Sequence, residues 1–300
     1  MRDLPKIRDS LSFLYFEYGH LEQSKLGVEF INKQVRIPVP VASLAVLMLG
    51  PGTTVTHGAV RQAAEAGCSL VWCGEQGVRC YAQGIGETHK AYRLMRQAEL
   101  SVQPIQRLQV VERMYRARFA EPLPAGLRLE QLRGREGIRV REAYAQAARH
   151  HGVTWNGRNY DRSDWEGADP VNRALSAANA CLHGLVHAAL LSSGYSPALG
   201  FIHQGKQLSF VYDIADLYKM ELTVPVAFSV VAEGLPSLET QVRKRCRDAF
   251  TNLRLLQRIV PDVDRLLRLD VEPENPDGFD PDADPALPTP WWGNVKSHKS

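Results

Sequence analysis

Hydrophobic and polar residues follow two different patterns along the chain. Up to about residue 84, apolar residues stand in short runs between turns rich in Gly and Pro, which is typical of β-strands. From His89 onward, apolar residues recur at helical spacing, three and four positions apart. The pattern predicts an α+β protein with a small β domain followed by a larger all-α domain.

The same pattern predicts individual elements. Strands are expected at 11–16, 28–31, 35–41, 43–49, 69–73 and 77–82. The turn Asn32-Lys33-Gln34 joins two of them into a hairpin, and a helix over 57–67 interrupts the strands and is closed by its final glycine. Helices are expected at 90–100, 104–119, 128–150, 170–193, 207–220, 222–233, 238–260 and 262–268.

Changes in composition predict the domain boundaries. The β-rich domain covers 1–84, a linker covers 85–90, and the helical domain covers 91–270. Residues 271–300 are rich in Pro and acidic residues and poor in apolar ones, so this tail is expected to be disordered and flexible. The tryptophan pair near its end suits either a docking peptide or an incidental apolar tip.

Composition excludes several classes of protein. The chain has 300 residues, 44% of them hydrophobic, which is enough for one large or two modest cores. We identify no signal peptide and no apolar run near eighteen residues, so the sequence predicts a cytoplasmic protein with no membrane partner. The five cysteines form no CxxC pair, which argues against a zinc site or a disulfide framework.

Charge is unevenly distributed. The formal net charge is only +3, but residues 90–141 hold twelve Lys and Arg against five Asp and Glu, and eleven of the twelve are Arg. Arginine binds phosphate through two parallel hydrogen bonds, so this segment suits a polyanion. A solvated helical face is the alternative interpretation.

One segment combines a histidine with two acids. Asp213 and Asp216 are three residues apart, so on a helix both carboxylates leave the same face, and His203 precedes them by ten residues. Carboxylates with one imidazole suit Mg²⁺ or Mn²⁺. A structural histidine and a helical Asp pair are the alternative. The overlapping loop 200–207 resembles a nucleotide-phosphate loop but has Gln207 where Ser or Thr is required, so we reject that interpretation.

Glu136 is a further candidate acid. It stands between Gly134 and Gly137 in the arginine-rich segment. A surface ion pair with Arg139 or Arg133 is the simpler interpretation. The glycines favour a site, because each weakens a helix by up to about 1 kcal/mol and permits close approach of a ligand.

Three long motifs occur in a fixed order: QLRGREGIRVR around Glu136, VTWNGRNYD over 153–161 and GFIHQGKQLSFVYDIAD over 200–216. In this respect the chain resembles the CRISPR-associated adaptation integrases (the Cas-one family), and among them the type I-E subtype. The resemblance extends from about Leu11 through Arg247 and leaves out the tail.

The resemblance implies a β-sandwich-like N-terminal domain that mediates homodimerisation, and a helical catalytic domain. It implies that Glu136, His203 and Asp216 bind Mg²⁺ or Mn²⁺, with Asp213 as a supporting acid. It also implies a small companion subunit, Cas-two, with which the homodimer captures a short DNA duplex. The captured duplex is then inserted as a spacer into the CRISPR array, the adaptation step of antiviral defence.

DNA contacts are expected from five residues. The resemblance places Tyr18, Arg79 and Lys206 near DNA, Arg158 belongs to a loop that also carries aromatic residues, and Arg139 belongs to the basic segment. Two functions remain in competition. The first is a metal-dependent DNA integrase and endonuclease, in which a DNA 3′-hydroxyl attacks a phosphodiester. The second is a non-catalytic scaffold that binds nucleic acid.

Overall fold

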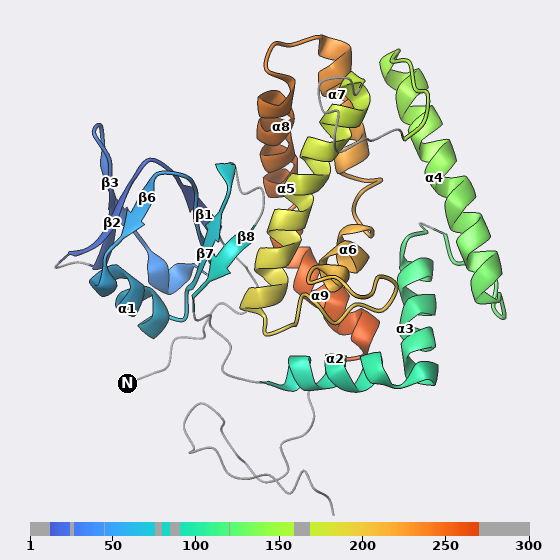
Figure 1. The fold of residues 1–300 in the computed structure, drawn as a ribbon, viewed down its shortest axis with the longest axis horizontal. Coiled ribbons are helices and arrows are strands. Elements are labelled where there is room, and N and C mark those ends of the chain that lie inside the picture. The colour runs from blue at the N-terminus through green and yellow to red at the C-terminus, as the bar shows by residue number, and fades with distance from the viewer. Residues whose placement is uncertain are drawn as a thin grey trace, which may run out of the picture.

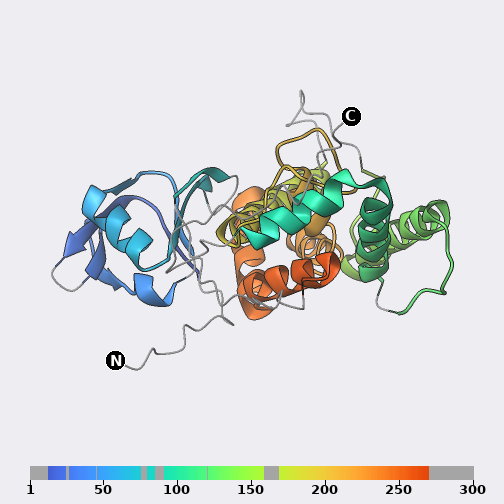
Figure 2. The same ribbon diagram turned by 90° about the horizontal axis from the view of Figure 1, so that it is seen from below.

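The two-part organisation is confirmed: in the computed structural model the strands lie between Phe13 and Gln83 and the long helices between Tyr92 and Leu267 (Figure 1). The structure describes residues 13–24, 27–44, 46–75, 80–84, 91–119, 121–158 and 169–269. The predicted linker, the predicted tail and Arg79 lie outside these residues. The β part and helices α3 and α4 lie at opposite ends of the molecule (Figures 1 and 2).

The β part consists of two four-stranded sheets. Their orders are β1-β5-β7-β8 and β4-β3-β2-β6. In the first sheet β1, β5 and β7 are parallel and β8 is antiparallel. In the second, β3 and β4 form the predicted hairpin. The bounds are β1 Phe13–Phe16, β2 Gly19–Ser24, β3 Gly27–Ile31, β4 Arg36–Val39, β5 Val46–Leu49, β6 Thr53–Val55, β7 Ser69–Cys73 and β8 Cys80–Gln83.

Both sheets bury side chains in one core. Leu21 and Phe30 come from one sheet, Leu47 and Leu70 from the other, and Ala63 from helix α1 (His57–Glu65). Helix α1 begins where a threonine hydroxyl accepts a hydrogen bond from the first turn, and it ends at a glycine with φ +74°. Two sheets with a shared core account for the sandwich-like arrangement.

The helical part contains α2 Tyr92–Val102, α3 Pro104–Ala117, α4 Leu129–His151, α5 Pro170–Ser192, α6 Ser209–Ala215, α7 Thr223–Glu233, α8 Leu238–Asn252 and α9 Leu255–Leu267. Three expectations were wrong. The helix expected at 238–260 ends early and the one expected at 262–268 begins early, as α9, because Arg254 adopts a left-handed conformation with φ +47° between α8 and α9. The helix expected at 207–220 is only the short α6, so Asp216 follows the helix as its cap.

Helix α5 is the central helix (Figure 1). It packs against α6, α7, α8 and α9, and most of its side chains belong to the main core. Its length and composition would allow it to cross a membrane, so the expectation that no apolar run of that size exists was wrong. Burial distinguishes α5 from a membrane-spanning helix, since 67% of its most apolar 18-residue stretch is buried inside the protein, as expected of a core helix.

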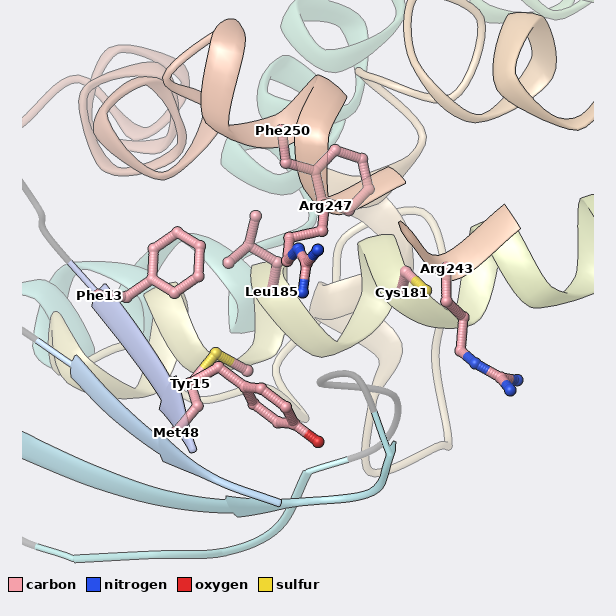
Figure 3. A pocket seen from close by; sticks show the side chains of 8 residues that line it. All are labelled: Phe13, Tyr15, Met48, Cys181, Leu185, Arg243, Arg247 and Phe250. Carbon is pink, nitrogen blue, oxygen red and sulfur yellow. The ribbon is translucent and has the colours of Figure 1, made fainter. Parts of the chain in front are cut away.

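The first sheet packs on α5. Val46, Met48 and Val71 belong to one buried apolar cluster with Ala188 of that helix. A small, mostly apolar cavity of about 40 Å³ lies at this junction, between β1, β5, α5 and α8 (Figure 3). At its edge Arg243 extends away from the apolar side chains that line it (Figure 3). The junction therefore joins the β part to the central helix of the helical part.

Candidate active site

Asp213 organises the loop before α6. Its side chain is fully buried. One carboxylate oxygen accepts hydrogen bonds from the backbone amides of Phe201 and Ile202 at 2.6 and 3.0 Å. The other accepts from the amide and from Nδ1 of His203 at 2.9 and 2.7 Å. These four hydrogen bonds use all four lone-pair sites of the carboxylate. Asp213 therefore supports the site and is not itself a metal ligand in this arrangement.

The hydrogen bond to Asp213 orients His203. In the neutral imidazole, an Nδ1–H that donates to a carboxylate leaves the lone pair on Nε2. The His203 side chain is 44% exposed, so the ring is accessible to a ligand. A carboxylate behind a histidine is the usual partner of a metal-binding imidazole. The pair thus has the chemistry of a metal-binding imidazole, His203, and a carboxylate that orients it, Asp213.

Gly200 determines whether this loop can form. A Cβ added there would lie 2.4 Å from the His203 carbonyl oxygen and 2.7 Å from the Ser209 Cβ, so the backbone must move. We expect Gly200→Ala to lower the melting temperature and to displace His203 from Asp213. Gly205→Ala is the control, because its Cβ meets nothing and only its left-handed backbone is strained. Equal melting temperatures for the two variants would contradict this account.

Glu136 and Asp216 are brought together by Arg118. Glu136 lies on α4, Asp216 caps α6 and Arg118 caps α3. Nη1 of Arg118 is 3.3 Å from a Glu136 oxygen, and its Nη2 is 3.4 Å from an Asp216 oxygen. One guanidinium therefore spans two candidate ligands that belong to different helices.

Each carboxylate also has a cation of its own. Arg139 donates two hydrogen bonds to Glu136, at 2.8 and 3.0 Å. Lys219 lies 2.6 Å from Asp216. Burial by itself raises the pKa of Asp216, but Lys219 and Arg118 outweigh it and hold the pKa below its ordinary value. Glu136 thus forms the predicted ion pair with Arg139, but this ion pair involves a buried carboxylate and not a surface one.

The donor set fits a hard divalent cation in its chemistry. Glu136 and Asp216 supply carboxylate oxygens, and His203 supplies an imidazole. Within the described part of the chain, however, no three His, Cys, Asp or Glu side chains lie close enough to form a ready metal site. The three candidate ligands do not converge, because Arg118 stands between the two carboxylates and His203 faces Asp213.

The residues predicted to contact DNA lie in different surroundings. Tyr18 is 65% exposed and Lys206 is also exposed, so both are accessible to a ligand. Arg158 donates hydrogen bonds to Asn172 and Ser176, and Arg139 is engaged by Glu136. These intramolecular partners give Arg158 and Arg139 a structural role, and their DNA contacts stay predictions.

Sequence reasoning missed two residues of the site. Lys219 follows Asp216 by three positions, a spacing that brings side chains together on a helical turn, so a local signal for it existed. Arg118 had no such signal. It was one of eleven arginines in the basic segment, and only the packing of α3 against α4 distinguishes it.

Comparison with known proteins assigns the chain to a family. The model of CRISPR-associated protein Cas1 matches residues 117–239, which include the candidate site. A CRISPR-associated endonuclease Cas1 of Thermus thermophilus is 52% identical over 97% of this chain and 89% of its own length. The chain belongs to the Cas1 family.

Solved structures agree with this assignment. The crystal structure of a TtCas1–DNA complex superposes with a TM-score of 0.78 at 53% identity, over 88% of this chain and 99% of that one. A casposase bound to its integration product superposes with a TM-score of 0.60 at 10% identity, over 92% of this chain and 96% of that one. The second likeness shows the fold alone. The mixed fold, with N-terminal strands and C-terminal helices, is thus that of Cas1 proteins.

Proposed function

We propose that this Cas1 protein is a metal-dependent DNA integrase and endonuclease that inserts captured duplexes into a CRISPR array. The observation that carries the proposal is the pair of contacts by which Arg118 joins Glu136 to Asp216. His203 precedes Asp216 in the same segment and is oriented by its hydrogen bond to Asp213. Relatives named as CRISPR-associated endonucleases, and the DNA complex of one, support it.

The proposed reaction is a transesterification. The 3′-hydroxyl oxygen of the captured duplex bonds to a phosphorus of the array strand, and the bond from that phosphorus to the array's own 3′-oxygen breaks. One phosphodiester replaces another, so no energy source is required. With water as the nucleophile the same exchange is hydrolysis, which accounts for endonuclease activity.

Glu136, His203 and Asp216 would hold Mg²⁺ or Mn²⁺. When bound, such an ion neutralises charge on the reacting phosphate and lowers the pKa of the attacking hydroxyl. The chain's other residues prepare the site. Asp213 keeps the proton of His203 on Nδ1, and Lys219 keeps the Asp216 carboxyl ionised.

The finer assignments rest on the sequence motifs. We infer the type I-E subtype, a homodimer formed through the N-terminal β domain, and assembly with the companion subunit Cas-two. The proposal locates the protein in the cytoplasm, where a CRISPR array is accessible. A non-catalytic scaffold is the competing function, and the presence of all four residues, Glu136, His203, Asp213 and Asp216, argues against it.

A strand-joining assay tests the proposal. The protein, the companion subunit, a short duplex and a supercoiled array plasmid are incubated with Mg²⁺, Mn²⁺ or EDTA. We expect joined and relaxed plasmid with either metal and none with EDTA. A duplex with 3′-deoxy ends should abolish joining but leave metal-dependent cleavage. Binding of duplex without joining or cleavage under any metal condition would favour the scaffold.

Lys206 offers a test of DNA contact. If its ammonium neutralises one phosphate, Lys206→Ala weakens binding of unrelated duplexes about equally and reduces the salt slope, d log K/d log [salt], by about 1. Fluorescence anisotropy at several salt concentrations measures the slope. Lys206→Arg keeps the charge and should keep the slope; an unchanged slope in Lys206→Ala would place the residue away from DNA.

A further inference from the structure

Arg118 is a buried cation at the centre of the candidate site. Its side chain is only 6% exposed, and its guanidinium lies over the ring of Tyr115, 5.0 Å from the centroid. The two anions that balance it, Glu136 and Asp216, are the two carboxylates expected to bind a metal. The guanidinium therefore occupies a position between candidate ligands from two other helices.

The contacts of Arg118 are the weakest of the cluster. They measure 3.3 and 3.4 Å, and among the described residues its Nε and Nη2 have no hydrogen-bond partner although both atoms are buried. Arg139 contacts Glu136 at 2.8 Å and Lys219 contacts Asp216 at 2.6 Å. Buried donors are rarely left unpaired, so Arg118 is held by charge more than by hydrogen-bond geometry.

A count of lone pairs shows what Arg118 blocks. Each carboxylate oxygen accepts two hydrogen bonds. The Glu136 oxygen that faces Arg118 already accepts one from Arg118 and one from Arg139, so it is fully occupied. The Asp216 oxygen that faces Arg118 lies 3.4 Å from it, and the contact of Asp216 with Lys219 is made by the other oxygen. A cation that binds both carboxylates must compete with this guanidinium.

We propose that Arg118 is a positioning residue that holds Glu136 and Asp216 together in the metal-free protein and loses its contact with at least one of them when a divalent cation binds. The proposal rests on the metal site of the proposed function. It has two consequences. Arg118 stabilises the metal-free site, where two carboxylates would otherwise repel each other, and it lowers metal affinity through repulsion between like charges.

Arg118→Met is the decisive variant, because it keeps much of the side-chain volume and removes the charge. We expect the metal-free variant to melt at a lower temperature than wild type and to bind Mn²⁺ about tenfold tighter or more. Isothermal titration measures the affinity, and melting with Mn²⁺ or EDTA measures the stability. Neither readout depends on DNA chemistry. Arg96→Met, which removes a partly exposed arginine paired with Glu99 on α2, controls for net charge and should leave Mn²⁺ affinity unchanged.

The outcomes separate this proposal from the proposed function. If His203→Ala weakens Mn²⁺ binding but Arg118→Met binds as wild type or more weakly, the metal site stands and the role of Arg118 is overturned. If wild type binds no Mn²⁺, or His203→Ala leaves binding unchanged, the metal site itself is wrong. Should Arg118→Met fail to fold, Arg118→Gln decides, because it also removes the charge but keeps a polar amide at the site; it must bind Mn²⁺ more tightly than wild type.

Discussion

Alanine at Glu136, His203 or Asp216 is expected to reduce metal-dependent DNA cleavage and strand joining more than about a hundredfold, a larger loss than that typical of residues that only support a ligand. Each substitution removes one of three donors from a set that has little redundancy. Gel assays with Mg²⁺ and Mn²⁺ measure both activities. Glu130→Ala provides the control, since this acid is exposed in the first turn of the same helix as Glu136.

DNA binding should persist in the same three variants. The arginines of the segment 90–141 remain, and loss of a carboxylate removes repulsion toward phosphate. Anisotropy titrations with a short duplex give the comparison. Wild-type rates of joining in all three variants would show that the chemistry takes place elsewhere on the chain, and loss of binding would show that the residues serve the fold.

Asp213→Ala is expected to destabilise the protein by roughly 3 kcal/mol or more, because buried groups then lose an ionised hydrogen-bond partner. The backbone amides of Phe201, Ile202 and His203 all donate to this carboxylate. Urea unfolding followed by circular dichroism measures the change in free energy. The variant should also lose metal-dependent activity about 10–100-fold, because His203 is no longer oriented.

His203→Ala is the matched control for stability. It removes only the side-chain hydrogen bond and leaves three amides bound to Asp213. Its side chain is 44% exposed, so we expect a loss of free energy well below that of Asp213→Ala. If both variants unfold at the same urea concentration, Asp213 does not organise the loop.

The hydrophobic pattern predicted the helices and strands that bury either one face or nearly their whole surface. Helices α3, α4, α5 and α7 and the hairpin of β3 and β4 lie within a few residues of their predicted positions. Strand β2 was not predicted, although it pairs with two strands, because four of its six residues are polar and its pattern shows little alternation. The break at Arg254 was also missed, since arginine is a good helix former and the left-handed turn is imposed by the packing of α8 and α9.

For the site, the sequence by itself determined the local chemistry. His203 and Asp213 are ten residues apart and Asp216 and Lys219 are three apart, so local backbone geometry brings each pair of side chains together. The motifs also nominated Glu136. Only the tertiary structure decided that Arg118 joins Glu136 to Asp216, because that contact depends on how α3, α4 and α6 pack around the core formed with α5. Spacing along a chain fixes neighbours within a turn or two, but contacts between distant helices follow from the burial of their apolar faces.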